Sequence, residues 1–367
     1  MAANTILKIF SVARDHYQLV VMISVAFLMC GLLTYMLFYL YLRRKYEKTH
    51  EKWRLISDLL IRKAVFYEDE ELEDEVVIPV TKRATKLLHN KRFRKLLTAE
   101  IMSAKKNITG TSSDNLKQLY KQLHLEIYAL KNLKSRHWHI KAKAIQELTI
   151  MEMSEFQSDI YVHANAKNEL VRMEAQTALV QFNGFEGLSF LDIVTYPISD
   201  WQQIKLLQQL AHVPQIDVSI ETWLASSNSS VVVFTLKLAR NYHRFELYDD
   251  ILPCLDHSDP KVRLEAINFF CEIFTNETSD EFISRFLKEI LKNRVAMVKA
   301  MQNVGTERDI LFLLDLLDDK NHEIKLCAAR ALAKIGENGL TSLFDYANTI
   351  GYPLTEIVMQ IKGELAA

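Results

Sequence analysis

One uncharged stretch constrains the fold of this chain more than any other feature. Residues 19–42 read LVVMISVAFLMCGLLTYMLFYLYL and contain no Asp, Glu, Lys or Arg. A bilayer core about 30 Å thick needs about 20 apolar residues in a helix. The small polar side chains of Ser24 and Thr34 can bond to carbonyls of their own helix. The stretch therefore predicts one transmembrane helix, and residues 43–367 form the body that it anchors.

Other origins of this stretch fit the residues less well. A cleaved signal peptide has an apolar region of about 7 to 15 residues that ends at a small-x-small site. This run is longer and has no such ending. A lipid-attachment cysteine at Cys30 would need small residues before it, but residues 27–29 are Phe, Leu and Met. We therefore expect the helix to stay in the membrane.

The charges beside the stretch predict its orientation. Lys8 and Arg14 lie on its N-terminal side, where Asp15 opposes them. Its C-terminal side carries more cations, namely Arg43, Arg44, Lys45, Lys48, Lys52 and Arg54. The flank richer in Lys and Arg stays in the cytoplasm. We expect a single-pass protein of the inner or plasma membrane, with residues 1–18 as a short extracytoplasmic or interfacial segment and the C-terminal body in the cytoplasm.

The rest of the chain is unevenly charged. Residues 43–106 hold 17 Lys and Arg against 11 Asp and Glu, whereas residues 107–367 hold 26 against 34. The larger, acidic part would repel phosphate, so we expect no nucleic acid among the partners. The cations within 43–63 suit anionic membrane lipid headgroups, although they can also serve topology and solubility alone. Four cysteines with no CxxC pair fit a reducing cytoplasm.

Two charged segments follow the membrane helix. The acidic run 68–75 is typical of a solvated loop. The alternative is an electrostatic latch onto the basic stretch 82–95, which lies within the helical spacing of residues 81–104. Residues 107–114 then predict a loop, with Asp114 as the cap of the next helix.

A repeated pattern begins at four places after residue 115. The four segments are 137–148, 168–179, 259–270 and 321–336. In the third, Ser258 or Asp259 can cap a helix and Pro260 can take its first position. The branched residues of the four, Ile140, Val171, Val262 and Ile324, are separated by 31, 91 and 62 residues. These gaps are close to multiples of 31, so weaker copies are expected near residues 202, 231 and 293.

This pattern resembles HEAT and HEAT-like (armadillo-type) repeats, in which Asp-x-x-Val-Arg opens the second helix of a pair. Val171-Arg172, Val262-Arg263 and Ile324-Lys325 match best; Ile140-Lys141 matches partly, and Val231-Val232 lacks the basic residue. The resemblance covers roughly residues 115–350. It implies an all-α protein, with a single N-terminal transmembrane helix followed by an α-solenoid of helix pairs with a period of about 31 residues.

The expected units would each hold two helices of about 11 to 14 residues. Small residues at 144, 175, 266 and 328 would let neighbouring helices approach closely. The content of 9 Gly and 6 Pro is too low for a sheet-rich chain of this length. The organisation predicted from the sequence is 1–18 outside, 19–42 in the membrane, 43–110 as a juxtamembrane helical region and 111–367 as the repeat solenoid.

The candidate partner-binding residues are cations of the second helices: Lys141, Arg172, Arg263 and Lys325. The resemblance also implies a structural role for Arg172 and Arg263, because the arginine of such repeats often pairs with an acid of the adjacent unit.

No catalytic, cofactor-binding or metal-binding residue is predicted. The sequence has no HExxH, no GxSxG and no glycine-rich phosphate loop. His137 and His139, if both are helical, point about 200° apart and cannot share a metal. We therefore expect a protein that is not an enzyme and that uses no cofactor.

The function expected is that of a membrane-anchored cytoplasmic scaffold that binds a protein partner associated with the membrane. By analogy with bacterial proteins of this layout, complexes for polysaccharide synthesis or secretion are the expected clients. The alternative is an enzyme or enzyme subunit of the HEAT-like lyase or nucleic-acid-modifying type. A receptor whose membrane helix oligomerises is a third hypothesis.

Overall fold

The structure is a computed structural model that describes residues 2–67, 77–211, 213, 219–273 and 276–366. Within these ranges every regular element is a helix, and no residue lies in a strand. The chain forms two compact units. Unit 1 comprises Met1–Asn132 and Ile150–Glu152, and unit 2 comprises Leu133–Thr149 and Met153–Ala367. The all-α prediction is confirmed.

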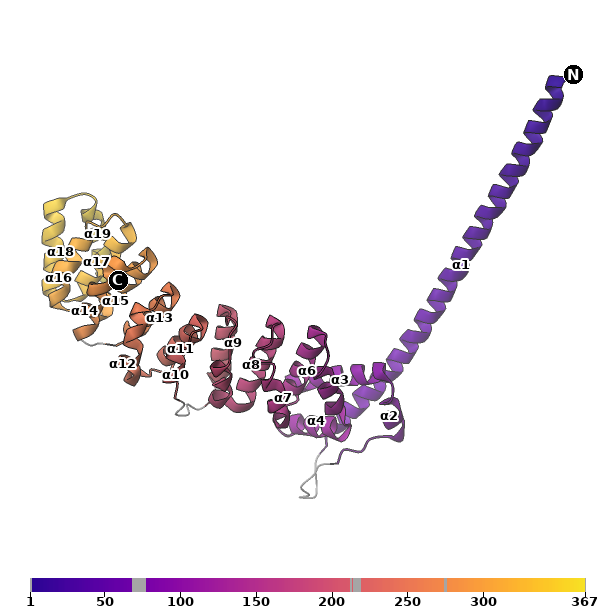
Figure 1. Ribbon diagram of the computed structural model, residues 1–367, viewed down its shortest axis with the longest axis horizontal. Helices are drawn as coiled ribbons and strands as arrows, with labels where there is room; N and C mark the ends of the chain where they lie inside the picture. The colour runs from indigo at the N-terminus through magenta and orange to yellow at the C-terminus, as the bar shows by residue number, and fades with distance from the viewer. Residues whose placement is uncertain (1, 68–76, 212, 214–218, 274–275, 367) are drawn as a thin grey trace. The chain divides into compact units, whose positions relative to one another are not determined.

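Unit 1 is built from the first helices of the chain. They are α1 (Ala2–Val65), α2 (Lys82–Leu87), α3 (Lys91–Asn107), α4 (Thr111–Gln122) and α5 (Leu125–Leu133), drawn from indigo to magenta in Figure 1.

Unit 2 contains the remaining helices. They are α6 (Trp138–Ile150), α7 (Gln157–Tyr161), α8 (Glu169–Asn183), α9 (Asp200–Leu210), α10 (Glu221–Leu224), α11 (Ser229–Asn241), α12 (Tyr248–Ile251), α13 (Pro260–Phe270), α14 (Asn276–Arg285), α15 (Leu291–Val304), α16 (Ile310–Leu316), α17 (His322–Lys334), α18 (Glu337–Ile350) and α19 (Leu354–Ala366). Short 3₁₀ helices lie between them: η1 (Ser154–Phe156), η2 (Gly184–Asp192), η3 (Phe245–Leu247), η4 (Leu252–Asp256), η5 (Phe286–Lys288) and η6 (Glu307–Asp309).

α1 joins the predicted membrane helix to the juxtamembrane region without a break (Figure 1). Ser24 Oγ donates to the carbonyl of Val21 at 2.8 Å, and Thr34 Oγ1 donates to that of Cys30 at 3.0 Å, as predicted. Among the described residues, α1 is the one helix long and apolar enough to cross a membrane, and its most apolar window is not buried by any part of the chain.

The C-terminal part of α1 packs on α3 and α4. Ser57, Leu60 and Ala64, at helical spacing, are buried there. Ser112 Oγ, in the first turn of α4, donates to the carbonyl of Val65 at 2.7 Å. Unit 1 is therefore assembled around the end of the same helix that carries the apolar stretch.

The structure corrects two local predictions in unit 1. The helical stretch 81–104 is interrupted, because the Asn90 side chain accepts a hydrogen bond from the Arg92 amide and starts α3 there. Asp114 is not the cap of the next helix. Gly110, whose φ of 73° suits glycine, is the N-cap of α4, so that Asp114 lies inside its first turn. The acidic run 68–75 lies outside the described residues, and the latch stays a prediction.

The expected second helices are present in unit 2 and pack side by side. α11 contacts α13, α13 contacts α15, and α15 contacts α17. The branched residues predicted at 171, 231, 262 and 324 are buried, whereas Ile140 is half-buried. The small residues Ala144, Ala175, Ala266 and Ala328 are buried as well. Second helices packed side by side at this spacing are the arrangement that the HEAT-like resemblance implies.

The first helices of the pairs are shorter than predicted. α7, α10 and α12 hold 5, 4 and 4 residues, and 3₁₀ turns extend several of them. One such turn, η2, packs closely on α8, since a Cβ on Gly187 would lie 2.2 Å from the Leu179 carbonyl oxygen of α8. Pro253 stands at the start of another, η4. The predicted length of 11 to 14 residues holds for the second helices α9, α11, α13, α15 and α17.

Candidate functional site

The repeat places one residue directly after each branched position of the second helices. In chain order these residues are Lys141, Arg172, Gln203, Val232, Arg263, Arg294 and Lys325. All are at least half-buried. This row contains the four candidate partner-binding residues and also Arg294, which the sequence analysis passed over although the expected copy near residue 293 includes it.

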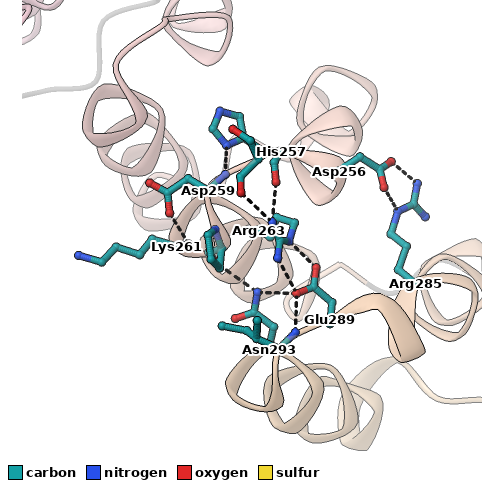
Figure 2. A network of polar contacts seen from close by, with 11 residues as sticks. Asp256, His257, Asp259, Lys261, Arg263, Arg285, Glu289 and Asn293 are labelled. Atoms are coloured by element: carbon teal, nitrogen blue, oxygen red, sulfur yellow. Dashed lines mark hydrogen bonds and ion pairs between the residues drawn. The ribbon is translucent and has the colours of Figure 1, made fainter.

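Arg263 links two successive turns of unit 2 (Figure 2). Its Nη1 donates to the carbonyl of His257 at 2.7 Å, in the turn before α13. Its Nε and Nη2 form a two-pronged pair with Glu289, whose side chain is only 4% exposed. Asn293 Nδ2 donates to the same carboxylate at 2.9 Å. The guanidinium therefore links α13 to the start of α15.

Arg172 and Arg294 make comparable links. Arg172 is buried, donates to the carbonyls of residues 166 and 167 at 2.8 and 2.9 Å, and lies 4.4 Å from the Tyr196 ring centroid. Arg294 Nη2 donates to Asp319 at 2.6 Å, and its guanidinium lies 4.5 Å from the Phe286 ring centroid. Arg263 pairs with an acid of the next repeat, as the resemblance implied, whereas the contacts of Arg172 are with backbone carbonyls and the Tyr196 ring.

The two candidate lysines lie differently. Both are half-buried, and Lys325 has no ion pair to another described residue. Lys141 is close enough to His163 to lower the pKa of that imidazole, an effect second to the desolvation of the ring. Among the described residues no contact joins any two of the four candidates, which belong to four different helices. Partner binding by these four residues stays a prediction.

A polar groove lies where three second helices begin. Its volume is about 660 Å³. The lining includes the N-cap residues of α9, α11 and α13, which are Ser199, Asn228 and Asp259. We call it the cap groove, and its lining residues are Val194, Thr195, Pro197, Ile198, Ser199, Asp200, Gln203, Ser227, Asn228, Ser229, Ser230, Val233, Asp259 and Lys261.

Hydrogen bonds between repeats hold the walls of the cap groove. Asn228 Nδ2 donates to the carbonyls of Val194 and Tyr196 at 3.2 and 3.0 Å, across 34 and 32 positions. Ser230 Oγ accepts from the Ile198 amide at 2.8 Å. The groove is therefore set by the packing of repeats and offers hydroxyl, amide and peptide groups that can bond to an extended polypeptide.

The cap groove was not predicted from the sequence. Ser258 or Asp259 was expected to cap a helix, and the structure shows that Asp259 does so. The Asn that opens the other strong copies is also visible in the sequence. The sequence does contain a signal for this groove. A cap residue recurs once per repeat, and such caps all lie at one edge of the stacked helices.

The described residues show no arrangement that points to catalysis. No group of three or more His, Cys, Asp or Glu among them could hold a metal ion. Burial raises the pKa of the Cys254 thiol to about 11 and also raises those of Cys271 and Cys327, which disfavours the reactive thiolate.

His137 and His139 do not point in opposite directions, as was expected for two residues of one helix. Their ring centroids are 5.7 Å apart, because α6 begins at Trp138 and His137 precedes it. The separation of about 200° that a helix imposes therefore does not apply to this pair.

Comparison with known proteins adds little to this picture. No protein-family model matches the sequence, and no curated protein matches it. Among solved structures, an engineered protein is similar over 75% of this chain and 85% of its own, with 16% identity and a TM-score of 0.38.

Two other solved structures are similar over most of this chain. A chain from the structure of Kap95p with RanGDP aligns with 85% of this chain and 46% of its own, at 12% identity and a TM-score of 0.38. Kap121p aligns with 86% and 48%, at 10% identity and a TM-score of 0.32. The chain thus spans about half the length of these two.

Proposed function

We propose that this protein is a membrane-anchored scaffold whose HEAT-like repeats bind a protein partner. The observation that carries the proposal is the uncovered apolar half of α1, which continues directly into the folded body. A helix that is apolar on all sides and is not covered by the rest of the folded chain needs lipid around it, because exposing its apolar surface to water costs free energy.

The flanking charges favour a cytoplasmic body and an N-terminus on the other side of the membrane. A body held at the membrane meets partners that are also held there, at a raised effective concentration. We therefore propose a membrane complex as the client, with the polysaccharide-synthesis and secretion assemblies named above as the first to be tested.

The cap groove is the proposed contact surface for the partner. Arg172, Arg263 and Arg294 all donate hydrogen bonds within the fold, which favours a contact surface other than the second-helix row. The groove instead exposes side chains from three successive turns, including Thr195, Ser227 and Lys261.

Capture from native membranes tests the proposal. The full-length chain would be extracted in detergent and its partners identified by mass spectrometry. We expect one stoichiometric membrane protein. Ser227→Trp, which fills the groove from an exposed position, should abolish capture without changing the melting temperature.

The matched control is Thr341→Trp, at an exposed position of α18 outside the groove, which should capture normally. Equal capture by both variants would contradict the groove as the contact surface. Recovery of the native chain from cells without detergent would contradict the membrane anchor.

A further inference from the structure

Unit 1 carries a second basic surface, separate from the cations of residues 43–63. It is formed by exposed residues of α2 and of the first turns of α3: Lys82, Arg83, Lys86, Lys91, Arg92 and Lys95. We call these six residues the α2–α3 basic surface. No Asp or Glu occurs between residues 76 and 99, and none of the six has an ion pair with another described residue.

The contacts of α3 fix where this surface lies along α1. The rings of Trp53 and Phe93 have centroids 6.1 Å apart, at the start of α3. Farther along both helices, α1 ends at Val65, whose carbonyl accepts from Ser112, just after α3. The basic start of α3 therefore lies beside Trp53, which precedes the buried residues Ser57, Leu60 and Ala64 of α1 and so is nearer the apolar stretch.

The distance from this surface to a membrane follows from helix geometry. Trp53 stands eleven positions after Leu42, or about 16 Å along the helix axis at 1.5 Å per residue. The headgroup layer fills about 5 to 7 Å of that distance. The remainder is comparable with a Debye length of about 8 Å and with the reach of an extended Lys or Arg side chain.

α1 is also stiff enough to hold this placement. It contains no Gly or Pro between residues 32 and 65 and is helical throughout that range. Phe93 is fully buried beneath the surface, which fixes the start of α3. The exposed cations around it are thus presented by a rigid support.

We propose that the α2–α3 basic surface binds the anionic headgroups of the membrane in which α1 is anchored. This inference rests on the proposed membrane anchor and adds a second contact with the same leaflet. Together, a spanning helix and a lateral basic surface would limit how far unit 1 tilts relative to the bilayer. The competing occupant is the acidic run 68–75 of the chain itself, which precedes the surface directly in sequence.

Hydrogen exchange of the full chain in lipid nanodiscs tests the proposal. One set of nanodiscs would contain phosphatidylcholine alone, and the other would contain added phosphatidylserine. We expect several-fold slower exchange of residues 82–95 in the anionic nanodiscs, and loss of that difference at high salt. The triple variant Lys91→Gln, Arg92→Gln, Lys95→Gln should lose the difference too.

The control variant neutralises three exposed cations of unit 2, Lys288→Gln, Lys292→Gln and Lys320→Gln, and should behave as the wild type does. Equal exchange of 82–95 in both lipid compositions would overturn the proposal. If that equal exchange then rises when the acids of 68–75 are changed to their amides, the acidic run is the occupant. Failure of the chain to enter nanodiscs at all would instead overturn the membrane anchor.

Discussion

Arg263 shows how a residue type that fits partner binding can be used inside the fold. A basic residue on a repeated helix is a reasonable candidate for a binding surface when only its spacing is known. The structure pairs it with Glu289, which is almost fully buried and follows it by 26 positions. These 26 positions place the two residues in neighbouring repeats. A buried carboxylate needs a cationic partner, and Arg263 of the neighbouring repeat supplies it.

Arg263→Ala should therefore destabilise unit 2. We expect a loss of about 3 kcal/mol, because the Glu289 carboxylate would stay buried without its cation. Lys325→Ala, at the same position of another repeat but without an ion pair to a described residue, should cost less than about 0.5 kcal/mol. Urea unfolding of both variants measures the difference, and equal costs would contradict the role given to the pair.

Asp256 gives a pH-dependent prediction. Its hydrogen bonds from Arg285, at 2.9 and 2.7 Å, hold the pKa of the carboxyl below its ordinary value. A depressed folded-state pKa contributes stability that is present above the unfolded-state value of about 3.9 and is lost as the pH falls through the folded-state pKa.

Asp256→Asn should thus lower the stability at neutral pH by less than about 1 kcal/mol, because the carboxylate is largely exposed. The difference from the wild type should shrink as the pH falls below about 4. Denaturant curves at several pH values measure it. Asp249→Asn, at an exposed carboxylate without an ion pair, is the control, and a difference that grows on acidification would refute the assignment.

The second helices of unit 2 are the elements that sequence patterns predicted best. Five of them, α8, α9, α11, α13 and α17, start at a polar cap that can be seen in the sequence, and the Asn168, Asp259 and Asn321 side chains accept hydrogen bonds from the amides that follow them. α15 differs, because its N-cap is Ile290. The short first helices carry fewer such signals, although Thr306 and Asp309 form a capping box at η6 and Pro253 stands at the start of η4. At Gly187 the backbone of η2 lies so close to α8 that a Cβ would not fit, a contact that the local sequence does not show.

Asn228 and Asn321 are both N-cap residues, but they make different sets of hydrogen bonds. Asn321 accepts from two amides of its own helix, so Asn321→Ala should cost about 1 kcal/mol. Asn228 caps α11 and also donates to the carbonyls of Val194 and Tyr196. Asn228→Ala should cost about 2 to 3 kcal/mol, because those carbonyls also lose their donor. Thermal unfolding compares the stability of the two variants. A smaller loss of stability for Asn228→Ala would show that the hydrogen bonds from Asn228 to the Val194 and Tyr196 carbonyls do not stabilise the fold.

At the scale of the whole molecule, the orientation in the membrane is the property to test. An exposed cysteine placed by Glu356→Cys, in α19, should be labelled by an impermeant maleimide only after the cells are made permeable. Asn4→Cys, before the apolar stretch, should be labelled in intact cells. The opposite result for the two positions would reverse the proposed topology.

Features that depend on local periodicity could be predicted from the amino-acid sequence alone. The uncharged run at 19–42 marked the candidate membrane helix, and the period of about 31 residues predicted stacked helix pairs, because an apolar face must recur wherever a helix is buried. Which groups meet can be seen only in the folded structure. Contacts between residues far apart in the chain set the partners of Arg263 and Arg294, the cap groove and the place where α3 starts beside α1. Such contacts leave no periodic mark in the sequence.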